Sequence, residues 1–459
     1  MAGTTAYANM HTHPQAEQAD GIRRFVQSAA KRRKPRNEAE VAVMPQFETR
    51  PGPQSPGDVR HPMDSNQRRD GPAQVKPDND PVAKVEAWLA EAELYFDPFA
   101  PNTFDAGNDP HLSAYLVGHD DFVAVWGDWI STILAPAGGG KSAFRTRLAY
   151  AARVGEDGRR IFPIVYSLPQ VSTLEAHLEG LCKSAAYELL LEMIYRPDRF
   201  ELLDSEARQQ VRGILDHNAV GWERFLPQLE RAGSHVPLAE TFDPAAVRLP
   251  NPPKPADVYK VCADLRAMRS TLPRLSVTER WRRLISFLLE TLKFEAIYVL
   301  VDGVDAYPET AHDLNAALAW LSPLLDQASA WAASRVFLKL FLPIELYDSL
   351  WQSYPHLLTF PARFAKIIWN PERLAEVLAA RLQVASDDVF DSLDALCTPA
   401  LRGLNHELAI LAHPAVPREV MVLASRLLVE HVRRPEVGDL LEPVDLEAAR
   451  DWYQFLIRR

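Results

Sequence analysis

Short apolar runs rich in β-branched and aromatic residues alternate with segments that carry apolar residues at helical spacing. Such a run, bounded by turn residues, is typical of a strand that is buried on both faces. Because a helical segment follows each strand from 129–136 onward, each later strand can return parallel to the one before it. The alternation therefore predicts a three-layer α/β domain with a mainly parallel sheet. We place the strands at residues 122–126, 129–136, 160–168, 294–306, 335–343 and 364–369.

Three regions lie outside this alternation. From about residue 172 to 293 the pattern is that of long helices, so we expect a large helical insertion in the α/β domain, which spans residues 81–370. Residues 371–459 have a helical pattern and predict a C-terminal helical domain. Residues 1–80 are rich in proline and poor in aromatic residues, and they bury too little apolar surface to offset the entropy of ordering. We expect them to form a disordered tail.

The tail carries a basic run, KRRKPR, at residues 31–36. Such a run can bind nucleic acid or an acidic partner, or it can be an ordinary solvated charge run, which is the more frequent case. The whole chain has a formal net charge of −11, so attraction to phosphate backbones or anionic lipid is not expected of the rest of the protein. Nucleic-acid binding through the tail is therefore an alternative that we do not favour.

The three cysteines lie far apart, in apolar stretches of helical pattern, and they form no C-x-x-C pair: Cys182, Cys262 and Cys397. This usage favours neither a disulfide framework nor a zinc site, and it fits a reducing, cytoplasmic setting. No apolar run reaches the ~18–20 residues that a membrane-spanning helix needs. The first twenty residues have no apolar core behind a basic start, so we do not expect a secretory signal.

A glycine-rich loop, ILAPAGGGKSAFR, joins the strand at 129–136 to a helical segment. It matches the phosphate-binding pattern G-x-x-x-x-G-K-[ST] except that Ala135 stands at the first glycine. The three glycines, Gly138, Gly139 and Gly140, would let the backbone approach phosphate oxygens closely. The alternative is a structural turn that happens to end in Lys-Ser.

In the phosphate-binding interpretation, each residue of the loop has a role. Lys141 would reach the β- and γ-phosphates of a nucleotide, and the Ser142 hydroxyl would be a ligand of Mg²⁺. The backbone of Ala137 and Ala143 would line the phosphates together with the three glycines. The partial positive charge at the start of the following helix would add to the attraction.

A second motif, IYVLVDGVDA, ends the strand at 294–306 with two acids. A phosphate-binding loop needs a carboxylate near Mg²⁺ at the end of a neighbouring buried strand, and Asp302 is placed to supply it. Asp305, three residues on, would polarise or position the attacking water. The alternative is an ordinary strand end with turn aspartates.

These two motifs, in this order, resemble those of P-loop ATPases of the additional-strand class, especially the AAA+ and STAND-like branch. The stretch DGVDA is similar to the hhhhDGhDE form of the second (Walker B) motif in STAND NTPases, with Ala306 where that pattern often has glutamate. The resemblance covers roughly residues 109–430. It implies a P-loop three-layer sandwich that binds ATP and Mg²⁺, with residues 371–459 acting as a helical lid.

Two arginines acquire candidate roles from the resemblance. Arg363, just before the last strand, would reach the nucleotide of a neighbouring subunit; the alternative is a solvated surface arginine. Arg418, in VPREVMVLASRLL, would point from the start of a lid helix to the phosphates; the alternative is simply a proline that begins a helix. The strand at 335–343 ends in Leu342 and Pro343, so the polar sensor that this class carries there is not evident.

Three functions share this site and differ in the consequence of nucleotide binding. The first is an ATPase that acts as a switch or remodelling motor on a protein partner or on its own copies. The second is a nucleic-acid-associated loader or initiator of the same fold. The third is a nucleotide-bound scaffold that does not hydrolyse ATP, because its second motif is altered.

Overall fold

The computed structural model describes residues 80–104, 106, 109, 111–117, 122–227, 254–268 and 275–458. Apart from Asp80, the tail expected at residues 1–80, including its basic run, lies outside the described residues. Every described residue belongs to one unit, Lys76–Arg459. Within the described part of the chain, no helix is both long and apolar enough to cross a membrane.

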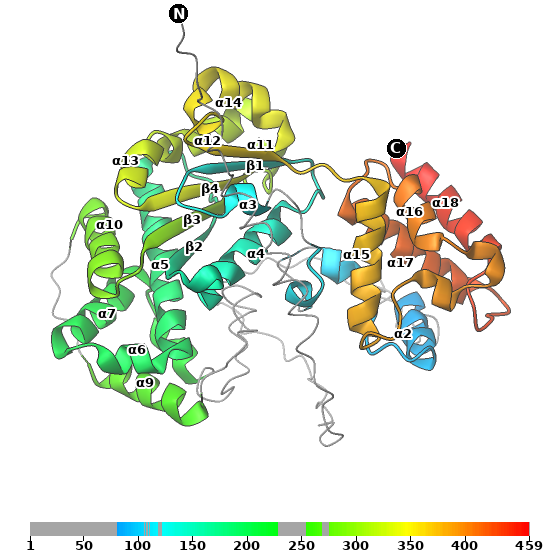
Figure 1. Cartoon of the computed structure of the whole chain (residues 1–459), viewed down its shortest axis with the longest axis horizontal. Helices are drawn as coiled ribbons and strands as arrows, with labels where there is room; N and C mark the ends of the chain where they lie inside the picture. The colour runs from blue at the N-terminus through cyan, green and yellow to red at the C-terminus, as the bar shows by residue number, and fades with distance from the viewer. Residues whose placement is uncertain are drawn as a thin grey trace, which may run out of the picture. The chain divides into compact units, whose positions relative to one another are not determined.

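Five parallel strands form one sheet in the order β2-β3-β4-β1-β5 (Figure 1). Five of the six expected strands are confirmed, and the α/β class with a parallel sheet is confirmed with them. The sheet places β4 between β1 and β3, so the strand before the glycine loop and the strand that ends at Asp302 are not neighbours. The strands are β1 (Ser131–Ala135), β2 (Ile161–Ser167), β3 (Ala296–Asp302), β4 (Val336–Pro343) and β5 (Arg363–Lys366).

The strands β1, β3 and β4 are mostly apolar and buried along their whole length, because helices cover both faces of the sheet. Successive side chains of a strand point to opposite faces, and in β3 they enter two different cores. Ile297, Val299 and Val301 pack with α5 (Leu174–Tyr195) and α10 (Val277–Ser286), whereas Tyr298 and Leu300 pack with α4 (Lys141–Val154). Every residue of β3 is buried, which is the pattern expected of a central parallel strand.

The expected strand at residues 122–126 is wrong, because Phe122–Val125 forms the short helix α3. A run of five apolar residues has no periodicity that separates a strand from a helical turn. In the helical form Phe122 and Trp126 lie four residues apart and stack on one another, and Val125 is buried. The carbonyl group of Val125, at the end of this turn, accepts hydrogen bonds from the side chains of Ser131 and Lys339.

Helices fill the long connection between β2 and β3, as expected for residues 172–293. The described helices there are α5 (Leu174–Tyr195), α6 (Pro197–Leu202), α7 (Ser205–Asn218), α9 (Pro255–Ala267) and α10 (Val277–Ser286), which continues as a π-helical turn, η7 (Phe287–Thr291). The remaining helices of the sheet region are α4 (Lys141–Val154), α11 (Pro308–Ala311), α12 (Leu314–Leu325), α13 (Ala328–Ala333) and α14 (Tyr347–Ser353).

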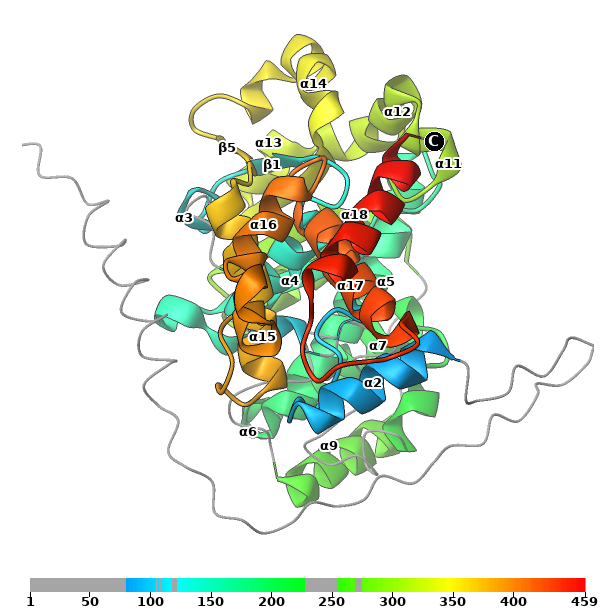
Figure 2. The same ribbon diagram turned by 90° about the vertical axis from the view of Figure 1, so that its right-hand side faces the viewer.

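The C-terminal helices build a second core, and the first described helix belongs to it. Val85, Trp88 and Leu89 of α2 (Pro81–Glu91) are buried among the C-terminal helices, and Figure 2 shows α2 beside α17. The expectation that this segment packs with the α/β domain is therefore wrong for α2. The C-terminal helices are α15 (Pro371–Ala385), α16 (Leu404–Leu411), α17 (Pro417–Arg433) and α18 (Pro443–Ile457).

A buried ion pair ties the chain before the sheet to this second core. Arg381 of α15 donates to a carboxylate oxygen of Asp109 at 2.9 Å, and both side chains are almost fully buried. The same guanidinium also donates to the Pro98 carbonyl at 2.8 Å. A buried charge of this kind requires partners on every side, so Pro98 and Asp109 are fixed against α15.

Candidate phosphate-binding site

The glycine loop lies at the carboxyl end of β1 and runs directly into α4. Gly138 has φ of 73° and Gly140 has φ of 92°, backbone angles that residues with a Cβ rarely adopt. Ala135 is the last residue of β1 and does not have a positive φ. The first position of the phosphate-binding pattern is therefore an ordinary strand residue here, and alanine fits it without strain.

Lys141, the first residue of α4, folds back over the loop. Its Nζ donates to the carbonyl groups of Ala135 and Pro136 at 3.2 and 3.3 Å. The same Nζ lies 3.0 Å from Oδ2 of Asp305. The side chain of Lys141 is 8% exposed and that of Asp305 is 26% exposed, so this ion pair is partly shielded from water. The structure thus joins the two sequence motifs through one contact.

Asp302 ends β3 beside the first turns of α4. Its Oδ1 accepts a hydrogen bond from the backbone N–H of Gly303 at 2.8 Å, and its Oδ2 lies 3.7 Å from Nε of Arg145. Both side chains are nearly buried. The Nε of Arg145 is buried and finds no hydrogen-bond acceptor among the described residues. Arg145 is therefore a cation beside the acid expected to face Mg²⁺.

Sequence reasoning did not assign Arg145 a role, although a signal was present. Arg145 follows Lys141 by four residues in α4, and residues four apart lie on the same face of a helix. A helix that presents Lys141 to one acid of the second motif therefore presents Arg145 toward the same strand end.

Two groups from outside the sheet contact the loop. The backbone N–H of Arg418, at the start of α17, donates to the Gly138 carbonyl at 3.3 Å. The Nε1 of Trp369, between β5 and α15, donates to the Gly139 carbonyl at 2.9 Å. A Cβ at Gly138 would lie 2.8 Å from the Cβ of Arg418, so only glycine permits this close approach.

Arg363 lies apart from the glycine loop. It is the first residue of β5, where it is in register with Ser131 at the opposite end of β1 from the loop. Its guanidinium lies over the rings of Trp129 and Phe360, 5.3 Å from each centroid. Within one chain Arg363 therefore does not belong to the group of residues around Lys141.

The remaining predicted site residues lie in the loop itself or in the first turn of the helix that follows it. Ala137 is exposed at its tip, and Ser142 and Ala143 occupy the first turn of α4, half-buried. Within the described ranges, no group of three or more histidine, cysteine, aspartate or glutamate side chains could hold a metal ion. A metal here would need Ser142, Asp302 and oxygen atoms from a bound anion.

No family model matches this chain, and neither the curated proteins nor the solved structures include a match.

Proposed function

We propose that this protein is a P-loop ATPase of the additional-strand class, similar to AAA+ and STAND proteins, that works as a nucleotide-dependent switch on a protein partner. The observation that carries the proposal is the contact between Lys141 and Asp305 at the glycine loop. A cation from a loop before a helix and acids from a buried strand end are the groups that a nucleotide triphosphate with its metal requires.

The order of the strands supports the class. One strand, β4, lies between the strand that precedes the glycine loop and the strand that carries Asp302. This extra strand is the feature for which the additional-strand class is named. In an open parallel sheet, ligands bind outside the carboxyl ends of the strands, and the glycine loop and both acids lie at that edge.

The residues at this edge fit a nucleotide and Mg²⁺. The positive φ of Gly138 and Gly140 opens the backbone toward a phosphate group. Lys141 provides the positive charge, and its present acceptors are two backbone carbonyls and one carboxylate that phosphate oxygens would replace. Ser142 and Asp302 would hold Mg²⁺, which when bound neutralises the charge of the phosphate oxygens. Arg418 would approach the phosphates from α17, so the C-terminal helices would act as a lid.

The switch follows from the partners that the two acids have in this structure. Asp305 is paired with Lys141, and Asp302 lies beside Arg145. Lys141 would exchange Asp305 for phosphate oxygens when a nucleotide binds, which would free Asp305 to orient a water, and Asp302 would lose its contact with Arg145 on serving as a ligand of Mg²⁺. Because the loop that precedes Lys141 contacts the start of α17 through Gly138 and Arg418, nucleotide binding would change how the C-terminal helices contact the loop.

A second candidate function, a nucleotide-bound scaffold that does not hydrolyse ATP, is favoured by one specific feature. The tip of β4 ends in Leu342 and Pro343, both buried and apolar, where a hydrolysing member of this class carries a polar sensor. Ala306 also replaces the glutamate of the second motif. In this case the ion pairs would break on binding and no turnover would follow.

ATP binding and turnover in the full chain test the proposal. Lys141→Ala removes charge-assisted hydrogen bonds to phosphate worth about 1.5–3 kcal/mol, so we expect ATP affinity to fall by about tenfold to a hundredfold. Lys183→Ala, at an exposed position of α5, is the matched control and should bind as the wild type does. Unchanged affinity in folded Lys141→Ala would overturn the proposal.

Turnover per protomer, measured over a range of protein concentrations with Lys141→Ala as the blank, separates the candidates. Turnover that rises with concentration places Arg363 in the site of a neighbouring copy, and Arg363→Ala should then abolish the rise. Turnover independent of concentration indicates a self-contained site. ATP binding without turnover assigns the scaffold function.

A further inference from the structure

A cavity of about 210 Å³ opens away from the glycine loop, beside the opposite end of α4. Its wall is formed where α4 ends, where β2 begins and where α5 passes into α6. Five arginines and two glutamates line it: Arg153, Arg159, Arg160, Arg196, Arg199, Glu188 and Glu192. An excess of arginine in a concave wall favours an anion.

Part of the positive charge is neutralised within the wall. Arg153 forms a bidentate pair with Glu188, with both distances at 2.7 Å. A single carboxylate, that of Glu192, contacts both Arg196 and Arg199. Arg196 also donates to the Arg153 carbonyl, which lies in the last turn of α4. The second glutamate is thus shared between two cations, and the wall keeps a surplus of positive charge.

Arg160 carries this surplus most directly. Its Nη2 donates to the Leu292 carbonyl at 2.7 Å, and its guanidinium lies 5.3 Å from the centroid of the Phe294 ring. Its Nε is buried and has no hydrogen-bond partner among the described residues. Burial, and then the positive charge of Arg199, lowers the pKa of Arg160. An anion in the cavity would offset both the cost of burying the Arg160 charge and the repulsion from Arg199.

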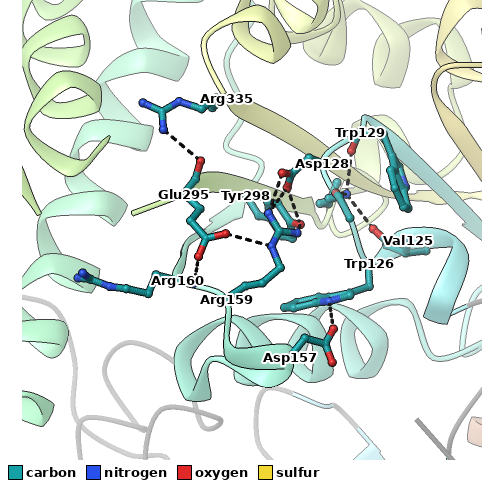
Figure 3. Close-up of polar contacts among 12 residues, drawn as sticks. Val125, Trp126, Asp128, Trp129, Asp157, Arg159, Arg160, Glu295, Tyr298 and Arg335 are labelled. Carbon is teal, nitrogen blue, oxygen red and sulfur yellow. Dashed lines mark hydrogen bonds and ion pairs between the residues drawn. The ribbon is translucent and has the colours of Figure 1, made fainter. Parts of the chain in front are cut away.

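Glu192 and Glu295 attract the Arg160 guanidinium through their charges, but Glu295 forms its close contacts with other groups. Figure 3 shows its carboxylate between Arg159 and Arg160, but it accepts from the backbone N–H of Arg160 at 3.2 Å and lies 3.4 Å from Nε of Arg159. Arg159 in turn donates to both carboxylate oxygens of Asp128, at 2.8 and 2.7 Å. The acids on this side are therefore bound by Arg159 and by the backbone. The charge of the Arg160 guanidinium is thus available to a ligand in the cavity.

We propose that this cavity is a second anion site, distinct from the nucleotide site, and that it binds the phosphate group of a small phosphorylated compound through Arg160 and Arg199. Planar guanidinium groups present several N–H donors in the geometry that a phosphate accepts. Pockets that hold drug-sized ligands measure about 300–1,000 Å³, so a cavity of about 210 Å³ takes inorganic phosphate or a small phosphate ester and excludes a whole nucleotide.

The two sites lie at opposite ends of α4. The glycine loop precedes Lys141, and the cavity wall includes Ala152, Arg153 and Val154 at the other end of this 14-residue helix. At 1.5 Å per residue they are about 20 Å apart. Phosphate binding at the cavity can therefore be measured in a protein whose glycine loop has lost Lys141, and the two proposals fail independently.

Calorimetric titration of the full chain with inorganic phosphate and with phenyl phosphate tests the site. We expect one phosphate to bind at this site in both the wild type and Lys141→Ala. In Arg160→Gln, and separately in Arg199→Gln, each made in the Lys141→Ala background, the dissociation constant should rise at least about tenfold, because each loses charge-assisted hydrogen bonds. Arg282→Gln, at a 72% exposed side chain of α10, is the matched control and should leave the affinity unchanged.

Some outcomes identify the kind of phosphate compound that binds, and the others overturn the proposal. Tighter binding of phenyl phosphate than of inorganic phosphate indicates an ester ligand, and equal or weaker binding indicates free phosphate; both support the site. Absence of phosphate binding in folded Lys141→Ala, or unchanged affinity on adding Arg199→Gln, overturns it even if Arg160→Gln does not fold. Benzoate that binds as tightly as phenyl phosphate overturns the assignment to phosphate.

Discussion

At the scale of single residues, the contact between Lys141 and Asp305 leads to the sharpest prediction. In the structure this ion pair holds the cation that we propose binds the nucleotide, so removing the carboxylate should make Lys141 more available. A partly exposed pair contributes about 0.2–1 kcal/mol, and we expect Asp305→Asn to bind ATP about 1.4-fold to fivefold more tightly. If Asp305 also orients the attacking water, turnover should fall by about a hundredfold or more.

Calorimetry and single-turnover measurements on the same preparations check both effects. Asp451→Asn, at an exposed position of α18, is the control and should change neither quantity. Weaker ATP binding in Asp305→Asn, with turnover unchanged, would contradict both assigned roles.

Residue types and spacing predicted the acids and the loop but not their present partners. Lys141, Asp302 and Asp305 follow from two short motifs because each motif is a local pattern in the chain. Trp369 could not be found in this way, since its contact with the Gly139 carbonyl joins residues 230 positions apart. The role of Lys339 could not be predicted from the sequence either, because it interrupts an otherwise apolar strand. In the structure it is fully buried and donates to the carbonyls of Val125, Gly127 and Trp129.

At the scale of elements, the strands that alternate with helical segments were predicted correctly, and the apolar run at 122–126 was not. Five strands were found because each is bounded by turn residues and lies between two helical segments. The run at 122–126 was misassigned because its five residues satisfy either a strand or a helical turn. The deciding contacts are tertiary: the helical turn presents the Val125 carbonyl to Ser131 and Lys339, and no local pattern contains that information.

A buried histidine that joins α5 to β2 and α12 predicts a pH dependence of stability. His177 of α5 is fully buried; its Nδ1 lies 2.9 Å from the Tyr166 hydroxyl, and its Nε2 lies 2.8 Å from the Trp320 carbonyl. Burial lowers the pKa of His177 below its ordinary value of 6.5, against the opposing effect of the Trp320 carbonyl. The neutral ring satisfies both partners, with a donor at Nε2 and an acceptor at Nδ1.

The sign of the effect depends on which state binds more protons. Below pH 6.5 the unfolded chain protonates this histidine before the folded chain does, so stability present above pH 6.5 is lost as the pH falls. Between about pH 7.5 and 5.5, the free energy of unfolding should fall by up to about 1.4 kcal/mol per pH unit more in the wild type than in His177→Gln. Urea unfolding measures this difference, and His356→Gln, at an exposed position, should keep the wild-type dependence. Parallel pH dependence in wild type and His177→Gln would contradict the prediction.

At the scale of the whole molecule, the sequence predicted helices near both ends of the described chain but not their association. The apolar spacing in α2 shows that one face must be buried, and it does not say against which partner. In the structure, Trp88 packs in the core that α15 and α17 form, and Arg381 of α15 binds Asp109. The segment of the chain that precedes the sheet is thus packed against the C-terminal helices.

This arrangement would make Trp369 a reporter of the proposed nucleotide binding. Its indole N–H holds the Gly139 carbonyl at 2.9 Å, on the loop where the proposed phosphates would lie, and α15 begins two residues later. Replacing the Lys141–Asp305 contact by phosphate should shift the loop and change the surroundings of the indole. We therefore expect Mg-ATP to change the tryptophan fluorescence of the wild type, and the change to be lost in Trp369→Phe and in Lys141→Ala.

Trp351→Phe, which removes a tryptophan that is 50% exposed, is the control and should retain the response. The two losses have different causes, because Lys141→Ala removes the binding and Trp369→Phe removes only the reporter. Calorimetry on Trp369→Phe should therefore still detect ATP. A wild-type fluorescence response in Trp369→Phe would show that the signal arises elsewhere, and the hydrogen bond from Trp369 would then not be the link through which the loop acts on the C-terminal helices.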